Sequence, residues 1–275
     1  MGIVNVTPDS FSDGGRYLDA GRAAAHGFDL AAAGADVLDV GGESTRPGAA
    51  RVGADEEIRR VVPVIERLAA ESGVPVSVDT MKAEVAAAAL EAGAEIVNDV
   101  SAGRADPGML PVVAARGAGY VVMHMLGTPA TMQDDPRYDD VVAEVGDFLE
   151  ERLEAAAGAG IPVEGLMADP GIGFGKTTAH NLELLRRLPE LVGRLDPVPV
   201  LVGTSRKAFL GRLLAGPDGE IPAADEREEA TLATVVWAFD SGAAMVRVHD
   251  VRPAAEAARL LAALAAAPRL TSTES

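Results

Sequence analysis

Short apolar runs rich in β-branched residues alternate with longer segments of helical period along the whole chain. The runs contain few polar positions, a pattern typical of parallel strands that are buried on both faces. They predict eight strands, near residues 3–6, 37–40, 76–78, 96–97, 120–123, 166–168, 200–202 and 245–248. The Ala-, Leu- and Glu-rich segments between them predict helices at 20–33, 54–71, 82–92, 107–116, 138–159, 179–188, 206–214, 226–241 and 253–266.

Eight strand–helix units in 275 residues match a single (β/α)8 barrel in number, order and length. An open, doubly wound sheet is the alternative. The Gly- and Pro-containing segment 215–224 fits a loop inside the seventh unit, so we expect one domain over residues 1–267 and a polar, frayed tail at 268–275. Only Met1 and Gly2 precede the first strand, from which we expect either an open barrel floor or missing upstream residues.

Charge and composition exclude several classes of protein. The 24 basic and 42 acidic residues give a net charge of -18, and the basic residues are scattered, which argues against nucleic-acid binding. The absence of Cys removes disulfides and thiolate metal sites, and the four His are well separated, so any metal should have oxygen ligands. No signal peptide and no membrane-spanning segment are recognisable, and we expect a cytoplasmic protein.

Polar and glycine-rich residues follow one predicted strand after another. In a barrel these strand ends meet on one rim, the carboxyl-terminal face where barrel active sites are built. A single Asp or Asn after a strand is more often a helix cap or part of a turn. Eight polar strand ends together indicate a functional site.

The residue types at this rim suggest two kinds of ligand group. Carboxylate and amide acceptors suit a flat heterocycle that presents several N–H donors, and the candidates are Asp79, Asn98 and Asp169. Cationic donors suit a phosphate group, and the candidates are Arg46, Arg247 and His249. Hard oxygen ligands at the end of the first strand suit Mg²⁺ shared with a polyphosphate, and the candidates are Asn5, Asp9 and Asp13.

The glycine-rich segment 171–177 is similar to a nucleotide-binding P-loop but lacks its spacing. The P-loop pattern requires Gly five residues before the Gly-Lys pair, and that position is Pro170. The segment does not match GxGxxG either, which weakens the open-sheet alternative. Lys occurs only at 82, 176 and 207, and two of the three lie in rim segments.

Seven ordered segments resemble those of the dihydropteroate synthases of the folate pathway. They are NVTPDSFSDGG at 5–15, GGESTRPG at 41–48, VDT at 78–80, NDVS at 98–101, DPGIGFGK at 169–176, SRK at 205–207 and RVH at 247–249. The resemblance covers nearly the whole chain. Ala102 departs from it, since the family more often has Gly there, and we expect the change to be tolerated.

The resemblance implies a homodimeric barrel enzyme, a target of sulfonamides, that joins 4-aminobenzoate to 7,8-dihydropterin-6-ylmethyl diphosphate with Mg²⁺ as cofactor. Diphosphate leaves first, in an SN1-like reaction, and the amine adds to the resulting cation. The implied catalytic residues are Asp79, Lys207, Arg247 and His249. The implied pterin-binding residues are Asp79, Asn98, Asp169 and Lys207. The implied diphosphate clamp is Arg46, Arg247 and His249, with Asn5, Asp9 and Asp13 at the metal. The implied 4-aminobenzoate pocket is Thr45, Pro47, Phe174, Ser205 and Lys207.

Three other readings stay open. A pterin-binding methyltransferase barrel would share the acidic and amide residues but would not need Arg46, Arg247 and His249. A non-catalytic paralogue would be expected to lose loop residues first, and both long loops are intact. A structural protein would have no use for a polar rim.

Overall fold

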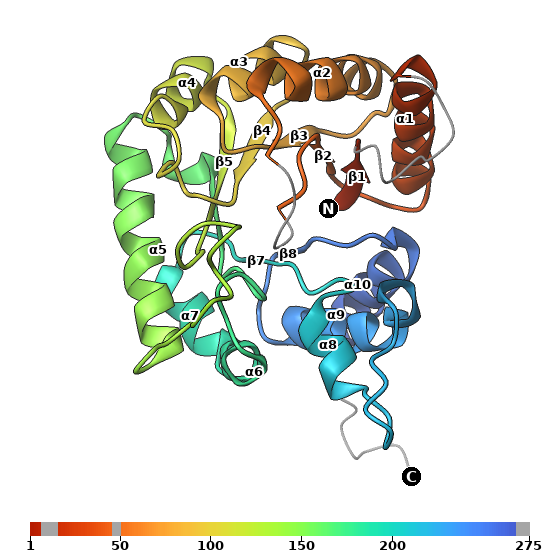
Figure 1. Cartoon of the computed structure of the whole chain (residues 1–275), viewed down its shortest axis with the longest axis vertical. Helices are drawn as coiled ribbons and strands as arrows, with labels where there is room; N and C mark the ends of the chain where they lie inside the picture. The colour runs from red at the N-terminus through yellow and green to blue at the C-terminus, as the bar shows by residue number, and fades with distance from the viewer. Residues whose placement is uncertain (7–15, 46–50, 268–275) are drawn as a thin grey trace.

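Eight parallel strands alternate with helices in the computed structural model, which describes residues 1–6, 16–45 and 51–267 (Figure 1). The order of strands confirms the predicted fold class. The strands are β1 (Gly2–Asn5), β2 (Leu38–Gly41), β3 (Val76–Asp79), β4 (Ile96–Asp99), β5 (Gly119–Met123), β6 (Leu166–Asp169), β7 (Leu201–Val202) and β8 (Met245–Val246).

The helices lie around the outside of the strands (Figure 1). They are α1 (Arg16–Ala32), α2 (Ala54–Glu71), α3 (Ala83–Glu91), α4 (Met109–Arg116), α5 (Val141–Gly158), α6 (Thr178–Arg186), α7 (Leu188–Leu195), α8 (Ala208–Leu213), α9 (Glu228–Asp240) and α10 (Val251–Ala266). Two short 3₁₀ turns, Val163–Gly165 and Ala224–Glu226, complete the connections. Only α7 was not predicted. It begins with Pro189 in its first turn, directly after the end of α6.

The strands form a ring whose hydrogen-bond ladder is interrupted at two places. Strands β1 to β6 pair in sequence order in one sheet, and β7 pairs with β8 in a second. Single parallel bridges, Ala168 to Val200 and Gly2 to Val248, join the two sheets at both edges. The ring therefore follows the order of a (β/α)8 barrel, with continuous ladders everywhere except at these two seams.

Apolar side chains fill the ring at the amino-terminal ends of the strands. Met1, Val37 and Leu201 form a buried cluster, and Ile96, Met167 and Met245 pack against it. These residues come from six different strands or their first flanking positions. A second, larger cluster lies between the strands and the helices and includes Val40, Val78 and Val122. The ring is thus closed by apolar side chains at the amino-terminal ends of its strands. The polar residues lie at the carboxyl-terminal ends.

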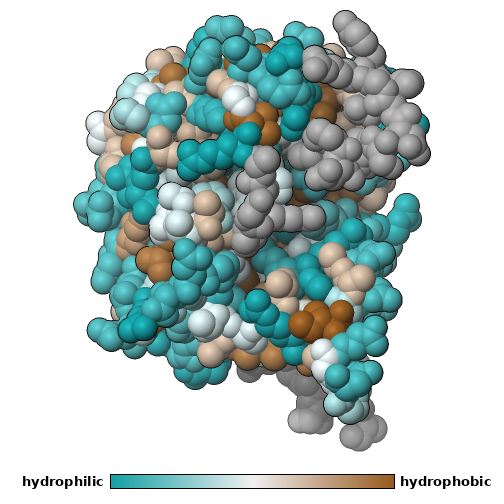
Figure 2. All heavy atoms as spheres, in the orientation of Figure 1, coloured by the Kyte–Doolittle hydropathy of each residue, from teal (hydrophilic) through white to brown (hydrophobic). Residues whose placement is uncertain are grey.

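The surface is mainly polar. Hydrophilic residues predominate on the face shown in Figure 2, and hydrophobic residues occur there in small groups. No helix in the described ranges is long and apolar enough to cross a membrane.

Candidate active site

The strand register brings the predicted rim residues to one level of the ring. Asn5 pairs with Gly41, Gly41 with Asp79, and Asp79 with Asn98. On the other side of the ring, Asp169 is paired with Met123. Because neighbouring parallel strands end at the same height, residues that are distant in sequence become neighbours here. Asn98 and Asp169 are buried, whereas Asn5 and Asp79 are partly exposed.

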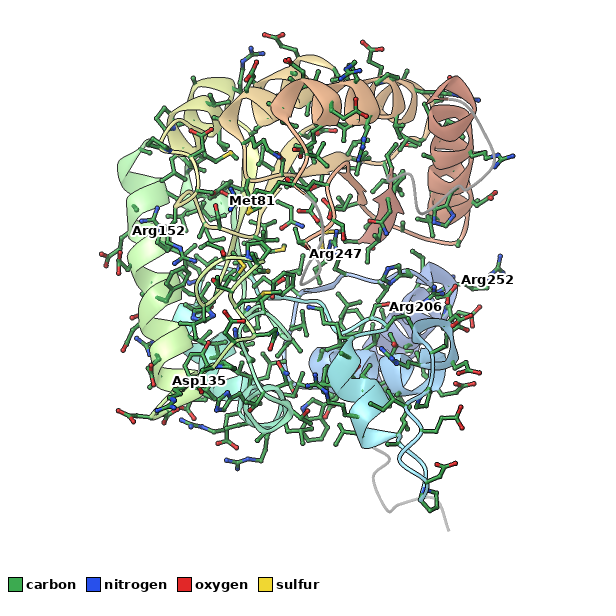
Figure 3. All side chains as sticks on the ribbon, viewed as in Figure 1. Met81, Asp135, Arg152, Arg206, Arg247 and Arg252 are labelled. Carbon is green, nitrogen blue, oxygen red and sulfur yellow. The ribbon has the colours of Figure 1, made fainter. Side chains whose placement is uncertain are left out.

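Arg247 lies near the centre of the molecule in the view of Figure 3. It binds two carboxylates. Its Nε is 2.6 Å from Oδ2 of Asp39, and its Nη2 is 2.8 Å from Oδ2 of Asp79. Asn98 donates from Nδ2 to the same Asp39 oxygen at 3.0 Å. The other oxygen of Asp39 is buried and has no hydrogen-bond partner among the described residues. The basic and acidic groups of the rim therefore form one network.

Burial raises the pKa of Asp79 to about 7, although the nearby Arg247 guanidinium opposes the shift. A carboxylic acid in a low-dielectric site favours its neutral form, and an adjacent cation favours the charged form. Asp79 therefore changes its charge close to neutral pH.

Asp169 and Lys207 are linked through the loop that follows β6. Asp169 accepts a hydrogen bond from the backbone N–H of Gly171 at 2.7 Å. Lys207 donates from Nζ to the carbonyl of Ile172 and lies 4.7 Å from the centre of the Phe174 ring. Burial lowers the pKa of Lys207 to about 8, and Asp169 opposes this shift. Burial raises the pKa of Asp169, with Lys207 and the Gly171 N–H acting against it.

Ser205 and His249 form a pair beside this network. The Ser205 hydroxyl lies 2.9 Å from Nδ1 of His249, and the backbone N–H of His249 donates to the same hydroxyl at 3.2 Å. The hydroxyl thus fixes both the ring and the backbone of His249. Arg247 lies two residues earlier, so one segment after β8 supplies two of the three cationic candidates.

A second ion-pair network includes Glu43, two residues before Thr45. Glu43 accepts a hydrogen bond from the backbone N–H of Val52 at 2.9 Å. Lys82 contacts Glu43 at 2.5 Å and also pairs with Glu57, whose side chain is fully buried. Thr45 itself is partly buried. Arg46, Pro47, Asp9 and Asp13 lie outside the described residues.

The structure links three of the predicted residues, Asp79, Asn98 and Arg247, in one network, and it pairs Ser205 with His249. Asp169, Phe174 and Lys207 meet at the loop after β6. The structure also adds residues that were not among the candidates. Asp39 is the most important addition, because it contacts both Arg247 and Asn98. The sequence signal for Asp39 is its position within an otherwise apolar predicted strand. A carboxylate buried there requires a partner. Lys176 is the second addition, and its contacts are described below.

A family model, related sequences and solved structures all indicate the same family of proteins. The family model described as "Pterin binding enzyme" matches residues 1–249. The dihydropteroate synthase of Mycobacterium leprae is 51% identical over 272 residues, which cover 98% of this chain and 95% of that protein. The structure of the Xanthomonas albilineans dihydropteroate synthase with 4-aminobenzoic acid has a TM-score of 0.89 at 50% identity, covering 98% of this chain and 93% of that chain.

A second structure of the Xanthomonas albilineans enzyme, in complex with 7,8-dihydropteroate, has a TM-score of 0.86 at 47% identity and covers 98% of this chain and 94% of that chain. Both the family match and the identity extend over the strands and loops that build the rim described above. This chain belongs to the pterin-binding enzymes and, within them, to the dihydropteroate synthases.

Proposed function

We propose that the chain condenses 7,8-dihydropterin-6-ylmethyl diphosphate with 4-aminobenzoate to give 7,8-dihydropteroate and pyrophosphate. It is a transferase, as its relatives are. The observation that best supports this reaction is the network around Arg247, because one site holds carboxylates for a cationic head and an arginine for an anionic tail. A pterin-binding methyltransferase of the same fold would need the carboxylates but not the arginine.

The pterin head binds to Asp79, Asn98, Asp169 and Lys207. The two carboxylates and the amide accept hydrogen bonds from the N–H edge of the ring, and the ammonium of Lys207 donates to its acceptors. In support of this, Asp79, Asn98 and Asp169 lie at the carboxyl ends of their strands, and Lys207 donates to the loop that follows Asp169. Burial of Asn98 and Asp169 strengthens these hydrogen bonds, because water competes less for them.

Arg46, Arg247 and His249 bind the diphosphate. Arg247 is bound by Asp39 and Asp79, so a diphosphate must compete with these carboxylates for the guanidinium. Binding of the pterin to Asp79 assists this exchange, because it removes one of the two carboxylate partners. The two halves of the substrate thus bind cooperatively.

The reaction begins with cleavage of the bond between the methylene carbon and the diphosphate oxygen. The electron pair leaves with the diphosphate, and the pterin methylene becomes a resonance-stabilised cation. The amine nitrogen of 4-aminobenzoate then adds to the carbon and loses a proton to water. Asp79 and Asp169 stabilise the positive charge, and Arg247 and His249 stabilise the leaving group, so catalysis depends on fixed charges. A pocket of Thr45, Pro47, Phe174, Ser205 and Lys207 holds the amine.

Mg²⁺ fits the donor chemistry at the end of β1. No group of three or more His, Asp or Glu within the described ranges could hold a metal ion by itself. Mg²⁺ commonly uses only one or two protein oxygens, with waters and substrate phosphates completing its shell. Asn5, partly exposed at the rim, supplies such an oxygen, and Asp9 and Asp13 complete the proposed set. When bound, the ion would neutralise charge on the leaving diphosphate.

We also propose that the enzyme is a cytoplasmic homodimer. Its sequence lacks cysteine, in keeping with a reducing compartment. On α9, Trp237 is 48% exposed and Val236 is 38% exposed, and such apolar side chains suit a subunit interface. Light scattering on the purified chain would give its mass in solution.

Pyrophosphate release tests the proposed function. Purified protein is given the pterin diphosphate, Mg²⁺ and 4-aminobenzoate, and each component is omitted in turn. We expect release that requires both the amine and the metal ion. Pterin binding without any release would instead identify a non-catalytic paralogue.

A further inference from the structure

The loop between β6 and α6 has an unusual pattern of hydrogen bonds. Each of its five successive backbone carbonyls, from residue 171 to residue 175, accepts a hydrogen bond from a side chain. The pairs are Gly171 with Lys176, Ile172 with Lys207, Gly173 with Gln133, Phe174 with Lys176, and Gly175 with Tyr138. Two of the chain's three lysines are therefore directed at one loop.

Lys176 lies inside this loop. Its side chain is 1% exposed, and its Nζ is 3.0 Å from the Gly171 carbonyl and 3.1 Å from the Phe174 carbonyl. The third contact is with Nδ1 of His124, at 2.8 Å. The three contacts match the three hydrogen-bonding positions of a lysine amine. His124 is itself held in place, because its ring packs edge-on against Phe148.

Burying the amine of Lys176 costs desolvation free energy, which its hydrogen bonds to the surrounding backbone must offset. No carboxylate among the described residues pairs directly with Lys176, and the charged groups that influence it are Asp169 and Lys207. Burial lowers its pKa. An apolar side chain would fill the same space without the cost of desolvation. The contacts with two carbonyls at opposite ends of the loop are what an apolar residue could not supply.

The outer side of the same loop faces the proposed pterin site. The Gly171 N–H donates to Asp169, and the Ile172 carbonyl accepts from Lys207. The Phe174 ring lies beneath the Lys207 ammonium. The loop therefore has an inner face fixed by Lys176 and an outer face that fixes two pterin-binding residues.

We propose that Lys176, supported by His124, is a positioning residue that sets the places of Asp169 and Lys207 through the loop 171–174. Because Lys176 is 1% exposed, it acts through the loop. The inference rests on the proposed function, because it takes Asp169 and Lys207 to bind the pterin. Its effect should appear in pterin affinity.

Two substitutions remove the amine in different ways. Lys176→Met keeps most of the apolar length of the side chain, whereas Lys176→Ala leaves a space behind. The probe is 6-hydroxymethylpterin, which lacks the diphosphate, and its binding is measured by calorimetry. We expect both variants to bind it about tenfold more weakly or worse, because buried carbonyls lose their donors.

Chemical rescue separates a hydrogen-bonding role from simple packing. Propylammonium can restore the missing three carbons and the nitrogen in Lys176→Ala, and 1-propanol fills the same space with a single donor. We expect propylammonium to recover pterin affinity and 1-propanol to fail. Thr177→Ala is the matched control, because it removes the cap of α6 at the neighbouring residue and leaves the loop carbonyls with their donors. This control should lose some stability but bind the pterin within twofold of the original chain.

Normal pterin affinity in folded Lys176→Met, or equal rescue by the alcohol, would overturn the proposal. If neither Lys176 variant folds, His124→Phe keeps an aromatic ring against Phe148 and removes only the nitrogen contact. Unchanged pterin affinity in His124→Phe would then count against a positioning role. Failure of the proposed function has a different signature, since the original chain itself would not bind the pterin.

Discussion

Burial moves the pKa values of Asp79 and Lys207 toward each other, to about 7 and about 8. The proposed chemistry needs Asp79 ionised and Lys207 protonated. The value of kcat/KM for the pterin diphosphate should therefore rise as pH rises through about 7 and fall as pH rises through about 8. This quantity reports the groups of the free enzyme.

Lys207→Arg provides the check on this profile. A guanidinium stays protonated over the whole range, so the alkaline fall should disappear while the acid limb stays in place. The measurement is kcat/KM against pH at saturating amine. An alkaline limb that persists in this variant would assign it to another group.

Arg247→Ala should lower kcat/KM by about a hundredfold or more, because it removes a donor to the leaving group. The substitution should also weaken inhibition by added pyrophosphate. Arg252→Ala is a suitable control, since Arg252 is exposed on α10 and lies away from the ring centre (Figure 3). Near-normal turnover and pyrophosphate inhibition in Arg247→Ala would argue against a diphosphate clamp.

Ala102 shows how a departure from the family pattern is accommodated. It has a φ of 54°, in the left-handed region that favours glycine. Such a conformation costs about 1–2 kcal/mol for a non-glycine residue. The buried methyl group of Ala102 and the lower entropy of its unfolded chain offset part of that cost.

At the scale of elements, Lys82 at the start of α3 pairs with Glu57 of α2 and with Glu43, which follows β2. Lys82→Met would leave the fully buried Glu57 without its cation. We expect the free energy of unfolding to fall by about 3 kcal/mol or more, as for other broken buried pairs. Urea unfolding measures this loss.

A surface ion pair provides the control for Lys82. Glu91→Gln breaks a pair with Arg116 in which both side chains are at least 40% exposed. The expected loss is below about 1 kcal/mol. The double variant Lys82→Met/Glu57→Gln should be more stable than Lys82→Met, because it no longer buries an unpaired charge. Equal losses of unfolding free energy in these two variants would contradict a charge effect.

Most elements were predictable because their periods are strong. The eight strands and the rim motifs follow from apolar runs that end in polar residues. The helix α7 was missed because only Arg187 separates it from α6. The sequence pattern predicted a single helix at 179–188 and a loop after it. Asp39 and Lys176 were not among the site candidates because their roles depend on partners more than 50 residues away, which a local pattern does not reveal. The proposed roles of the predicted site residues remain predictions.

At the scale of the whole molecule, the two seams of the ring predict uneven stability. Strands β7 and β8 have two residues each and join their neighbours through single bridges, whereas β3 and β4 lie inside a continuous ladder. Regions with few backbone hydrogen bonds open more easily. In hydrogen exchange, amides of β7 and β8 should exchange faster than those of β3 and β4. Equal protection in all strands would show that the seams do not weaken the ring.

The close contact between the loop after β6 and the end of β5 has a consequence for drug resistance. A methyl group added at Gly171 would lie 1.9 Å from the His124 carbonyl oxygen, and one at Gly175 would lie 2.5 Å from a Leu126 side-chain carbon. Both glycines also have positive φ. An inhibitor that contacts Gly171 or Gly175 would therefore meet few viable substitutions at these two positions.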